Sequence, residues 1–179
     1  PSWIMGDFHY HNEYEIYLTM TDGIKIFVNG KTYQANRGAL VVYNSSDMHR
    51  VVIPPDVEYE RYVIHFMPEY INHLSQPDAD LLDCFMNRGI DFRHIIQLND
   101  EQLDYLLGLF KKALSHYQSP TYGSSIYNQI ILAEILLFIN PLFSTITPPI
   151  ITSNGYMTVQ PILKYIHENI DNQLSIKDI

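Results

Sequence analysis

The first third of the sequence is a series of short segments with the composition of β-strands, each ending at a turn signal. Ile24, Ile26 and Val28 recur at every second position, which is typical of a strand with one buried face. Asn29-Gly30 follows directly, and this dipeptide favours a two-residue hairpin turn because both residues tolerate positive φ angles. Similar strand segments cover residues 14–20, 31–35, 40–43, 50–53 and 58–66. Strands this short and this regularly spaced predict an antiparallel barrel or sandwich.

Beyond Pro68 the pattern changes to that of helices. Residues 99–102 have the form of a capping box, in which Asn99 caps the helix and Gln102 reaches back to it. Apolar residues then recur at spacings of three and four as far as Tyr117, which predicts one amphipathic helix. A second predicted helix, at residues 124–140, is apolar on nearly every side.

A helix that is apolar on several sides is buried on several sides. We expect one side of the helix at 124–140 to pack on the β-strands and the other side to pack on a second copy of the chain. The alternative is a wholly internal helix. The residues predicted for the homodimer interface are Ile130, Ile131, Glu134 and Leu137.

Residues 141–157 contain three prolines together with Asn154-Gly155, and we interpret this stretch as a connector. Residues 175–178 form a new capping box just before the chain ends. We therefore expect the chain to be part of a longer protein that was cut within a helix. Between these two stretches, helical signals resume on the face formed by Val159, Ile162, Ile166 and Ile170.

The charge and composition exclude some functions. The chain has 11 Lys and Arg against 20 Asp and Glu, a net charge of −9, and no basic cluster that would neutralise DNA phosphates. Its one cysteine, Cys84, excludes an internal disulfide and fits a reducing compartment. The longest apolar run, at 130–139, contains Glu134 and is half as long as the ~20 residues of a membrane span. We therefore expect a soluble cytoplasmic protein that binds no membrane and does not bind DNA through this part.

Four residues stand out as a candidate binding site. His9, His11 and Glu15 form the pattern His-x-His-x-x-x-Glu, and histidines two positions apart project on the same face of an extended chain. Glu15 begins the next strand, and His49 follows at the end of a later one. Tyr17 shares the face of Glu15 by strand alternation, so we place it in the same pocket.

The other histidines show no ligand spacing, and we interpret them as surface or core residues: His65, His73, His94, His116 and His167. In the strand at 58–66, alternation leaves open which of two faces lines the pocket. One face carries Arg61, Val63 and His65, and the other carries Tyr62, Ile64 and Phe66.

The stretches that carry His9 to Glu15 and Gly38 to His49 resemble the paired motifs of the cupin superfamily. In the second stretch Asn44 and Ser46 stand where proline and glycine are typical, a departure that leaves His49 in place. With the helices, the connector and the final LSIKDI, the order of elements resembles the AraC family of bacterial regulators. This resemblance implies a mainly β fold with C-terminal α-helices, namely a cupin-type antiparallel β-barrel (double-stranded β-helix) followed by two or three helices.

The resemblance also implies a domain organisation. Residues 1–67 would form the effector-binding barrel, 68–145 a helical dimerisation region packed on it, 146–158 a linker, and 159–179 the truncated start of a helix-turn-helix domain. In that family the barrel binds a small effector and the C-terminal domain binds promoter DNA. The resemblance thus implies a non-enzymatic regulator that binds a small polar metabolite, such as a sugar, at His9, His11, Glu15, Tyr17 and His49.

Three roles remain open for His9, His11, Glu15 and His49. Three imidazoles and a carboxylate can hold a divalent transition metal such as Zn, Ni, Fe or Mn, with positions left for water or a ligand. Without any cofactor, the same side chains can contact a polar effector or simply hold strands together. The metal interpretation supports an alternative function, a metal-dependent cupin enzyme such as a dioxygenase or isomerase.

Overall fold

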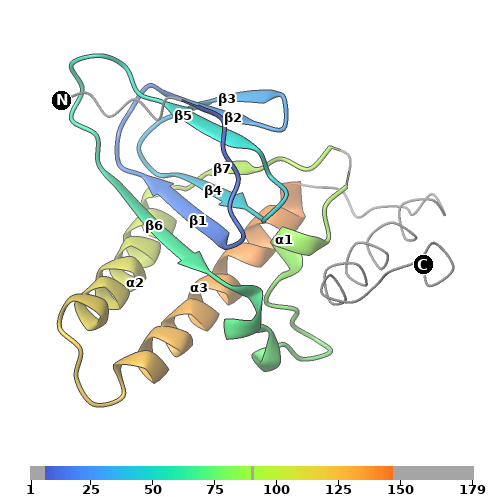
Figure 1. The fold of residues 1–179 in the computed structure, drawn as a ribbon, viewed down its shortest axis with the longest axis vertical. Coiled ribbons are helices and arrows are strands. Elements are labelled where there is room, and N and C mark those ends of the chain that lie inside the picture. Colours follow the sequence, from blue (N-terminus) through green and yellow to red (C-terminus); the bar gives the residue numbers. More distant parts are fainter. Residues whose placement is uncertain (1–6, 90, 147–179) are drawn as a thin grey trace, which may run out of the picture. The chain divides into compact units, whose positions relative to one another are not determined.

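The computed structural model describes residues 7–89 and 91–146 (Figure 1). Within these residues the strands are β1 (Tyr14–Thr19), β2 (Ile24–Val28), β3 (Lys31–Ala35), β4 (Ala39–Tyr43), β5 (His49–Val52), β6 (Arg61–Phe66) and β7 (Ile95–Gln97). Short 3-10 helices, η1 (Pro68–Tyr70) and η2 (Asn72–Leu74), precede α1 (Asp83–Met86), α2 (Asp100–Gln118) and α3 (Ser124–Ile146). The predicted linker from residue 147 and the predicted helix-turn-helix start at 159–179 lie outside the described residues.

The strands pair in two antiparallel sheets, one in the order β6-β1-β4-β7 and the other in the order β3-β2-β5. Every residue of β1 and β4 is buried because both faces of the larger sheet are covered. One face packs on the helices through a core that includes Leu40 and Leu106. The other face meets the smaller sheet across a second core that includes Val41 and Ile26. Figure 1 shows the resulting order of small sheet, large sheet and helices.

Most of the strands lie where the sequence predicts them, and the turn between β2 and β3 shows why. Asn29 and Gly30 have φ angles of 47° and 78°, as a two-residue turn between β2 and β3 requires. Val28 and Lys31 are then paired directly across this turn. The predicted mainly β fold with C-terminal helices is confirmed, with the strands divided between two facing sheets.

The pairing of β6 with β1 decides which face of β6 lines the space between the sheets. Glu15 lies opposite His65, and Tyr17 lies opposite Val63; directly opposed residues on neighbouring strands project on the same side. Because Tyr17 belongs to the core between the sheets, His65 and Val63 face that space as well. Ile64 packs instead toward the helices.

Helix α2 begins at the predicted capping box. The side chain of Asn99 accepts a hydrogen bond from the backbone N–H of Gln102, and the side chain of Gln102 accepts one from Asn99 in return. The sequence pattern beyond Pro68 predicts helices alone and misses β7. This strand has three residues and pairs with β4 at the sheet edge, so it is too short to show a period of two.

Helix α3 is longer than predicted. The sequence favours an end at Asn140 and a connector from Pro141, but the helix continues through Pro141 to Ile146. A proline inside a helix removes one backbone hydrogen bond. Beyond it Phe143 is buried, and its ring centroid lies 5.9 Å from that of Phe92, so core packing offsets the local cost.

One side of α3 is part of the core. By length and composition the stretch Ser124–Ser144 could cross a membrane, but core helices of soluble proteins share these properties, and Ile131 and Ile135 pack in the core against the larger sheet. Ile130 and Leu137 point away from it and are each 54% exposed. Ile131 is only 1% exposed, so it is a core residue, and we remove it from the predicted interface.

Candidate functional site

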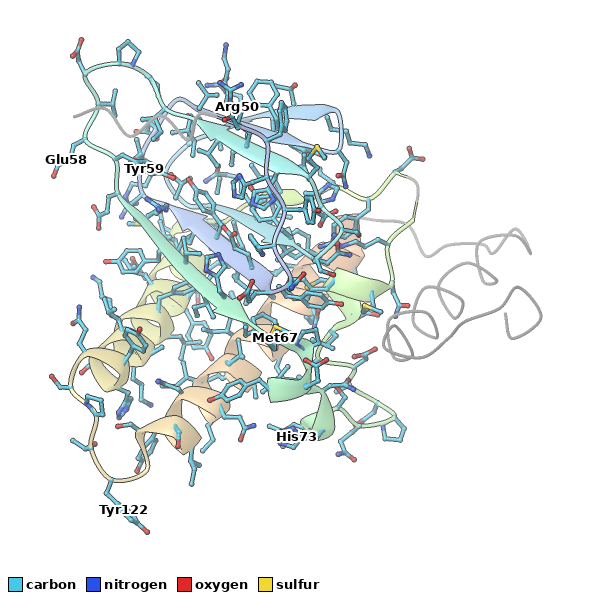
Figure 2. The ribbon with its side chains drawn as sticks, viewed as in Figure 1. Arg50, Glu58, Tyr59, Met67, His73 and Tyr122 are labelled. Atoms are coloured by element: carbon cyan, nitrogen blue, oxygen red, sulfur yellow. The ribbon has the colours of Figure 1, made fainter. Side chains whose placement is uncertain are left out.

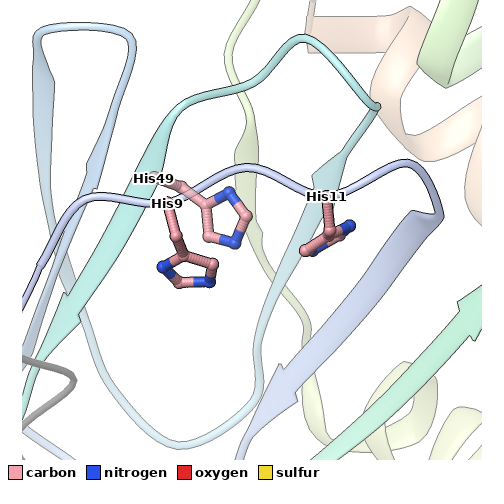
Figure 3. Close-up of side chains that lie close together, drawn as sticks. All are labelled: His9, His11 and His49. Carbon is pink, nitrogen blue, oxygen red and sulfur yellow. The ribbon is translucent and has the colours of Figure 1, made fainter.

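The segment that leads from the smaller sheet into the larger one carries both N-terminal histidines. His9 forms an antiparallel bridge with His49, the first residue of β5, with N–O distances of 3.1 and 3.0 Å. The chain then passes His11 and enters β1, where Glu15 faces the space between the sheets. Figure 3 shows the side chains of His9, His11 and His49 close together. The ring centroids of His9 and His49 are 4.3 Å apart, and those of His11 and His49 are 5.2 Å apart. The fold thus brings the four motif residues together.

A further imidazole reaches Glu15 from β6. Nε2 of His65 lies 2.9 Å from Oε2 of Glu15, its directly opposed neighbour on β1. The sequence interpretation of His65 as an ordinary surface or core residue misses this contact. The two residues are 50 positions apart, so only the register of β6 on β1 could have revealed it. We call His9, His11, Glu15, His49 and His65 the histidine cluster.

Glu15 is ionised although only 6% of its surface is exposed. Its Oε2 lies 2.9 Å from Nε2 of His11 and 3.7 Å from Nε2 of His49. Burial by itself raises the pKa of Glu15, but the surrounding imidazoles outweigh burial and hold this pKa well below its usual value. The hydrogen bond to Glu15 raises the pKa of His11, whereas burial and the neighbouring His49 lower the pKa of His9.

Backbone carbonyls orient two of the rings. Nδ1 of His11 is 2.8 Å from the carbonyl oxygen of Glu13, and Nδ1 of His49 is 2.8 Å from that of Asp47. A carbonyl only accepts, so each Nδ1 carries a hydrogen. Nε2 of His11 is then directed at Glu15. Nε2 of His49 is buried and has no hydrogen-bond partner within the described residues.

The donor set fits a divalent transition metal. Imidazole and carboxylate are ligands of Zn, Ni, Fe and Mn, and tetrahedral bonds of 2.0–2.1 Å separate two ligand atoms by about 3.3 Å. The distances from Oε2 of Glu15 to the three Nε2 atoms, 2.9 to 3.7 Å, lie on both sides of that value. Two overlapping groups have ligand atoms within 4.8 Å of one another: His9, His11 and His49, and His11, Glu15 and His65. Such an ion would supply Lewis acidity and an open position for a ligand.

The residue whose backbone carbonyl binds His49 also takes part in a buried ion pair. The carboxylate of Asp47, whose carbonyl holds His49, is paired with the guanidinium of Arg88 and lies 3.3 Å from Nε2 of His94. Burial raises the pKa of Asp47, but His94 and Arg88 outweigh it and hold the pKa well below its usual value. Asn29 also donates to this carboxylate, at 2.7 Å. The sequence shows no spacing that would have identified Arg88 or His94 as part of this network.

A family match covers the whole cluster. Residues 1–136 match the family described as the AraC-like ligand binding domain. The chain belongs to this family. The resemblance to AraC-type regulators that the motifs indicate is thereby confirmed. No curated protein matches the chain by sequence.

Solved structures of AraC-type regulators share the fold of this AraC-like domain at low identity. An apo variant of ToxT from Vibrio cholerae is 13% identical with a TM-score of 0.53, and the match covers 96% of this chain and 62% of that one. The AraC-like transcriptional activator CuxR is 13% identical with a TM-score of 0.54, covering 92% and 54%. ToxT bound to (E)-4-(8-methylnaphthalen-1-yl)but-3-enoic acid is 14% identical with a TM-score of 0.54, covering 94% and 62%. The chain thus spans 54–62% of the length of these proteins.

Three tyrosines line the interior of the AraC-like domain beside the histidine cluster. Tyr17 faces the same side as Glu15, as alternation predicts, and its hydroxyl lies 3.0 Å from that of Tyr59, on the segment leading into β6 (Figure 2). Tyr43 stacks on His49 with ring centroids 4.0 Å apart. The hydroxyl of Tyr43 is buried and has no hydrogen-bond partner within the described part of the chain. Tyr43 and Tyr59 are site residues that the sequence motifs do not include.

Proposed function

We propose that this chain is the effector-sensing and dimerisation part of a bacterial transcription regulator and has no catalytic activity. The effector binds between the two sheets, beside Glu15. Two buried atoms carry this proposal, because Nε2 of His49 and the hydroxyl of Tyr43 have no hydrogen-bond partner among the described residues. An unpaired buried polar group costs about 1–3 kcal/mol, which a ligand recovers when it supplies the partner. The family's description as a ligand-binding domain supports the same site.

We infer that the effector is a small neutral polar molecule such as a sugar. A sugar hydroxyl can donate to the carboxylate of Glu15 and accept from the hydroxyl of Tyr43. A second carboxylate placed beside the buried, ionised Glu15 would be repelled by it. The ligand of the ToxT structure is a carboxylic acid, and the charge of Glu15 is our reason for not extending that ligand class to this chain.

We propose that two copies of the chain pair through an exposed stripe on α3, formed by Ile126, Ile130, Glu134 and Leu137. These positions are three or four residues apart and therefore lie on one helix face. The three apolar members are all more than half exposed, and covering an exposed apolar patch is favourable. Glu134 accepts a hydrogen bond from Tyr105 of α2 at 2.8 Å.

The segment after β6 connects the site to this stripe. The hydroxyl of Tyr70, in η1, donates to the carbonyl of Ser125 at 3.0 Å, and the side chain of Gln129 donates to the carbonyl of Tyr70 at 2.7 Å. Ser125 and Gln129 lie on α3 next to Ile126 and Ile130 of the stripe. An effector that favours one position of β6 would therefore also favour one arrangement of two paired α3 helices.

We assign promoter binding to a DNA-binding domain outside this chain, and we place the regulator in the cytoplasm. The net charge of −9 disfavours contact between this part and DNA phosphates. The chain's coverage of little more than half of ToxT and CuxR supports a further domain.

The alternative function is a metal-dependent cupin enzyme, a dioxygenase or isomerase, that uses His9, His11, Glu15 and His49. The convergence of imidazoles on Glu15 favours it. We prefer the regulator because it also accounts for the exposed stripe on α3.

The proposed regulatory function is tested by measuring whether the full-length protein binds DNA. Fluorescence anisotropy is recorded over a range of salt concentrations, with and without a panel of neutral sugars. We expect sequence-specific binding that weakens with salt and changes when one of the sugars is present. Glu15→Gln should remove the response to the sugar and leave DNA binding itself intact, while Gln34→Glu, on the exposed face of β3, should preserve both. Absence of specific DNA binding would contradict the proposed regulatory function. Turnover of a substrate by the metal-loaded chain would favour the alternative, a metal-dependent enzyme.

A further inference from the structure

The turn between β2 and β3 contains a sequence that is prone to a covalent change (Figure 1). Asn29 is followed by Gly30, and both residues are exposed. Because glycine has no side chain, its backbone nitrogen can closely approach the side-chain carbonyl carbon (Cγ) of the preceding asparagine. A bond from the Gly30 nitrogen to Cγ closes a succinimide ring, while the bond from Cγ to Nδ2 breaks and Nδ2 leaves as ammonia with the Gly30 proton. Water then opens the ring to aspartate or isoaspartate, so water is the only co-reactant.

Hydrogen bonds to neighbouring residues hold the side-chain amide of Asn29 in place. Its Nδ2 donates to Oδ1 of Asp47 at 2.7 Å, and its Oδ1 accepts from the backbone N–H of Met48 at 3.0 Å. The ring-closing reaction removes Nδ2 from the side chain, so it must break the hydrogen bond to Asp47. Attack by Gly30 therefore requires that the amide first leave its partners. Local opening of the turn provides this release, and the closed turn slows the reaction.

The product of the reaction does not fit where the amide was. Asp47 is only 3% exposed, and its carboxylate is paired with Arg88. An aspartate at position 29 would place a carboxylate oxygen in the position from which Nδ2 donates to Oδ1 of Asp47. Two carboxylates at that separation repel each other, and neither has a hydrogen to donate. Isoaspartate would in addition insert an extra backbone atom into a two-residue turn. Either product therefore disturbs the residue whose carbonyl orients His49.

We propose that Asn29 is a deamidation site that the fold protects. The reaction follows opening of the turn between β2 and β3, and the new carboxylate then prevents the turn from regaining its contact with Asp47. A transient opening thus becomes a permanent loss of this contact. The turn itself does not explain the contact, because glycine tolerates the positive φ of Asn29 equally well. The inference goes beyond the proposed function and does not depend on it, since the reaction and its effect on stability are properties of this chain.

The protection is tested by following deamidation in the folded and the unfolded chain. The 179-residue chain is incubated at mildly alkaline pH without urea and in urea above its unfolding midpoint. Trypsin cleaves after Lys25 and Lys31 and releases the peptide 26–31, in which Asn29 is the only asparagine. Mass and chromatographic retention distinguish asparagine, aspartate and isoaspartate in this peptide. We expect the unfolded chain to react faster by about ten-fold or more, because hydrogen bonds that must break raise the activation barrier. Equal rates in the two samples would overturn the proposal.

The effect of the product is tested with two substitutions at the same position. Asn29→Asp supplies the new carboxylate directly, whereas Asn29→Gly removes the amide, adds no charge and keeps a residue that tolerates a positive φ. We expect a lower urea midpoint for Asn29→Asp than for Asn29→Gly. Gln34→Glu makes the same change of net charge on the exposed face of β3 and should keep the midpoint of the unmodified chain.

The comparison remains decisive where a variant is too unstable to fold. An Asn29→Asp chain that fails to fold while Asn29→Gly folds, as judged by far-UV circular dichroism, supports the proposal. The deamidated chain from the incubation, returned to buffer without urea, should show the same loss of stability as Asn29→Asp. Equal midpoints for Asn29→Asp and Asn29→Gly would show that the new carboxylate is tolerated beside Asp47 and would overturn the proposal.

Discussion

The backbone carbonyl of Asp47 accepts the Nδ1 hydrogen of His49 at 2.8 Å, while the carboxylate of the same residue is ion-paired with Arg88. Arg88 also donates to the carbonyl of Cys84 at 2.7 Å, and its guanidinium lies 4.5 Å from the ring centroid of Phe92. The orientation of the His49 imidazole therefore depends on a residue whose side chain belongs to a buried charge pair.

Replacing one member of this pair should cost much of the stability of the domain. Arg88→Met keeps the length of the side chain but leaves the carboxylate of Asp47 buried without its cation, and such a loss destabilises by about 3–5 kcal/mol. Urea unfolding of the 179-residue chain measures the change. The matched control is Arg93→Met on an exposed side chain, which should change the free energy of unfolding by less than about 0.5 kcal/mol. Equal stability of the two variants would show that the ion pair is dispensable.

Stability should fall in acid because the pKa of Asp47 is lower in the folded chain than in the unfolded one. Such a group contributes stability that is fully present above its unfolded pKa of about 3.9 and is lost as the pH falls below that value. Glu15, whose pKa is also lowered, acts in the same direction. We expect the thermal midpoint of the metal-free chain to decline below about pH 4–5, and to decline less steeply in Arg88→Met. A midpoint independent of pH down to about pH 3 would contradict this prediction.

The exposed stripe on α3 should control self-association. Ile130→Glu places a charge at the middle of the proposed dimer contact without disturbing the core, because Ile130 is more than half exposed. In sedimentation at about 100 μM, we expect the unmodified chain to be a dimer and this variant a monomer of unchanged stability. Gln34→Glu adds the same charge on β3 and should remain dimeric. A monomeric unmodified chain at this concentration would count against the interface.

Three glycines should respond differently to alanine. Gly38 has a φ of +81°, and an added Cβ would lie 3.2 Å from side-chain atoms of Gln97 and Leu103, so Gly38→Ala should destabilise by more than the ~1–2 kcal/mol of a left-handed residue. Gly30 has a φ of +78°, and nothing lies within 4 Å of an added Cβ. Gly30→Ala should therefore destabilise only through its left-handed backbone conformation. Gly108 lies within α2, also with open space, and Gly108→Ala should stabilise by about 0.5–1 kcal/mol. The urea midpoint at constant slope gives this order, and equal effects at Gly38 and Gly30 would exclude the steric contribution.

Features that depend on neighbouring residues could be predicted from the sequence alone. The Asn29-Gly30 turn and the Asn99 cap each rest on backbone geometry and hydrogen bonds within a few positions. The same holds for the shared face of Glu15 and Tyr17, because strand alternation is a local property. That His9 and His49 meet is not a local property; the resemblance to the cupin motifs implied it, and the fold brings the two residues together.

Only the tertiary structure placed His65 against Glu15, because contact across 50 positions depends on which strands pair and in which register. It also decided that α3 continues through Pro141, since the core contact of Phe143 outweighs a local helix-breaking signal. The tertiary structure also assigns Ile131 to the core and not to the predicted interface. The helix is apolar on almost every side, so only its packing on the larger sheet decides which side is covered.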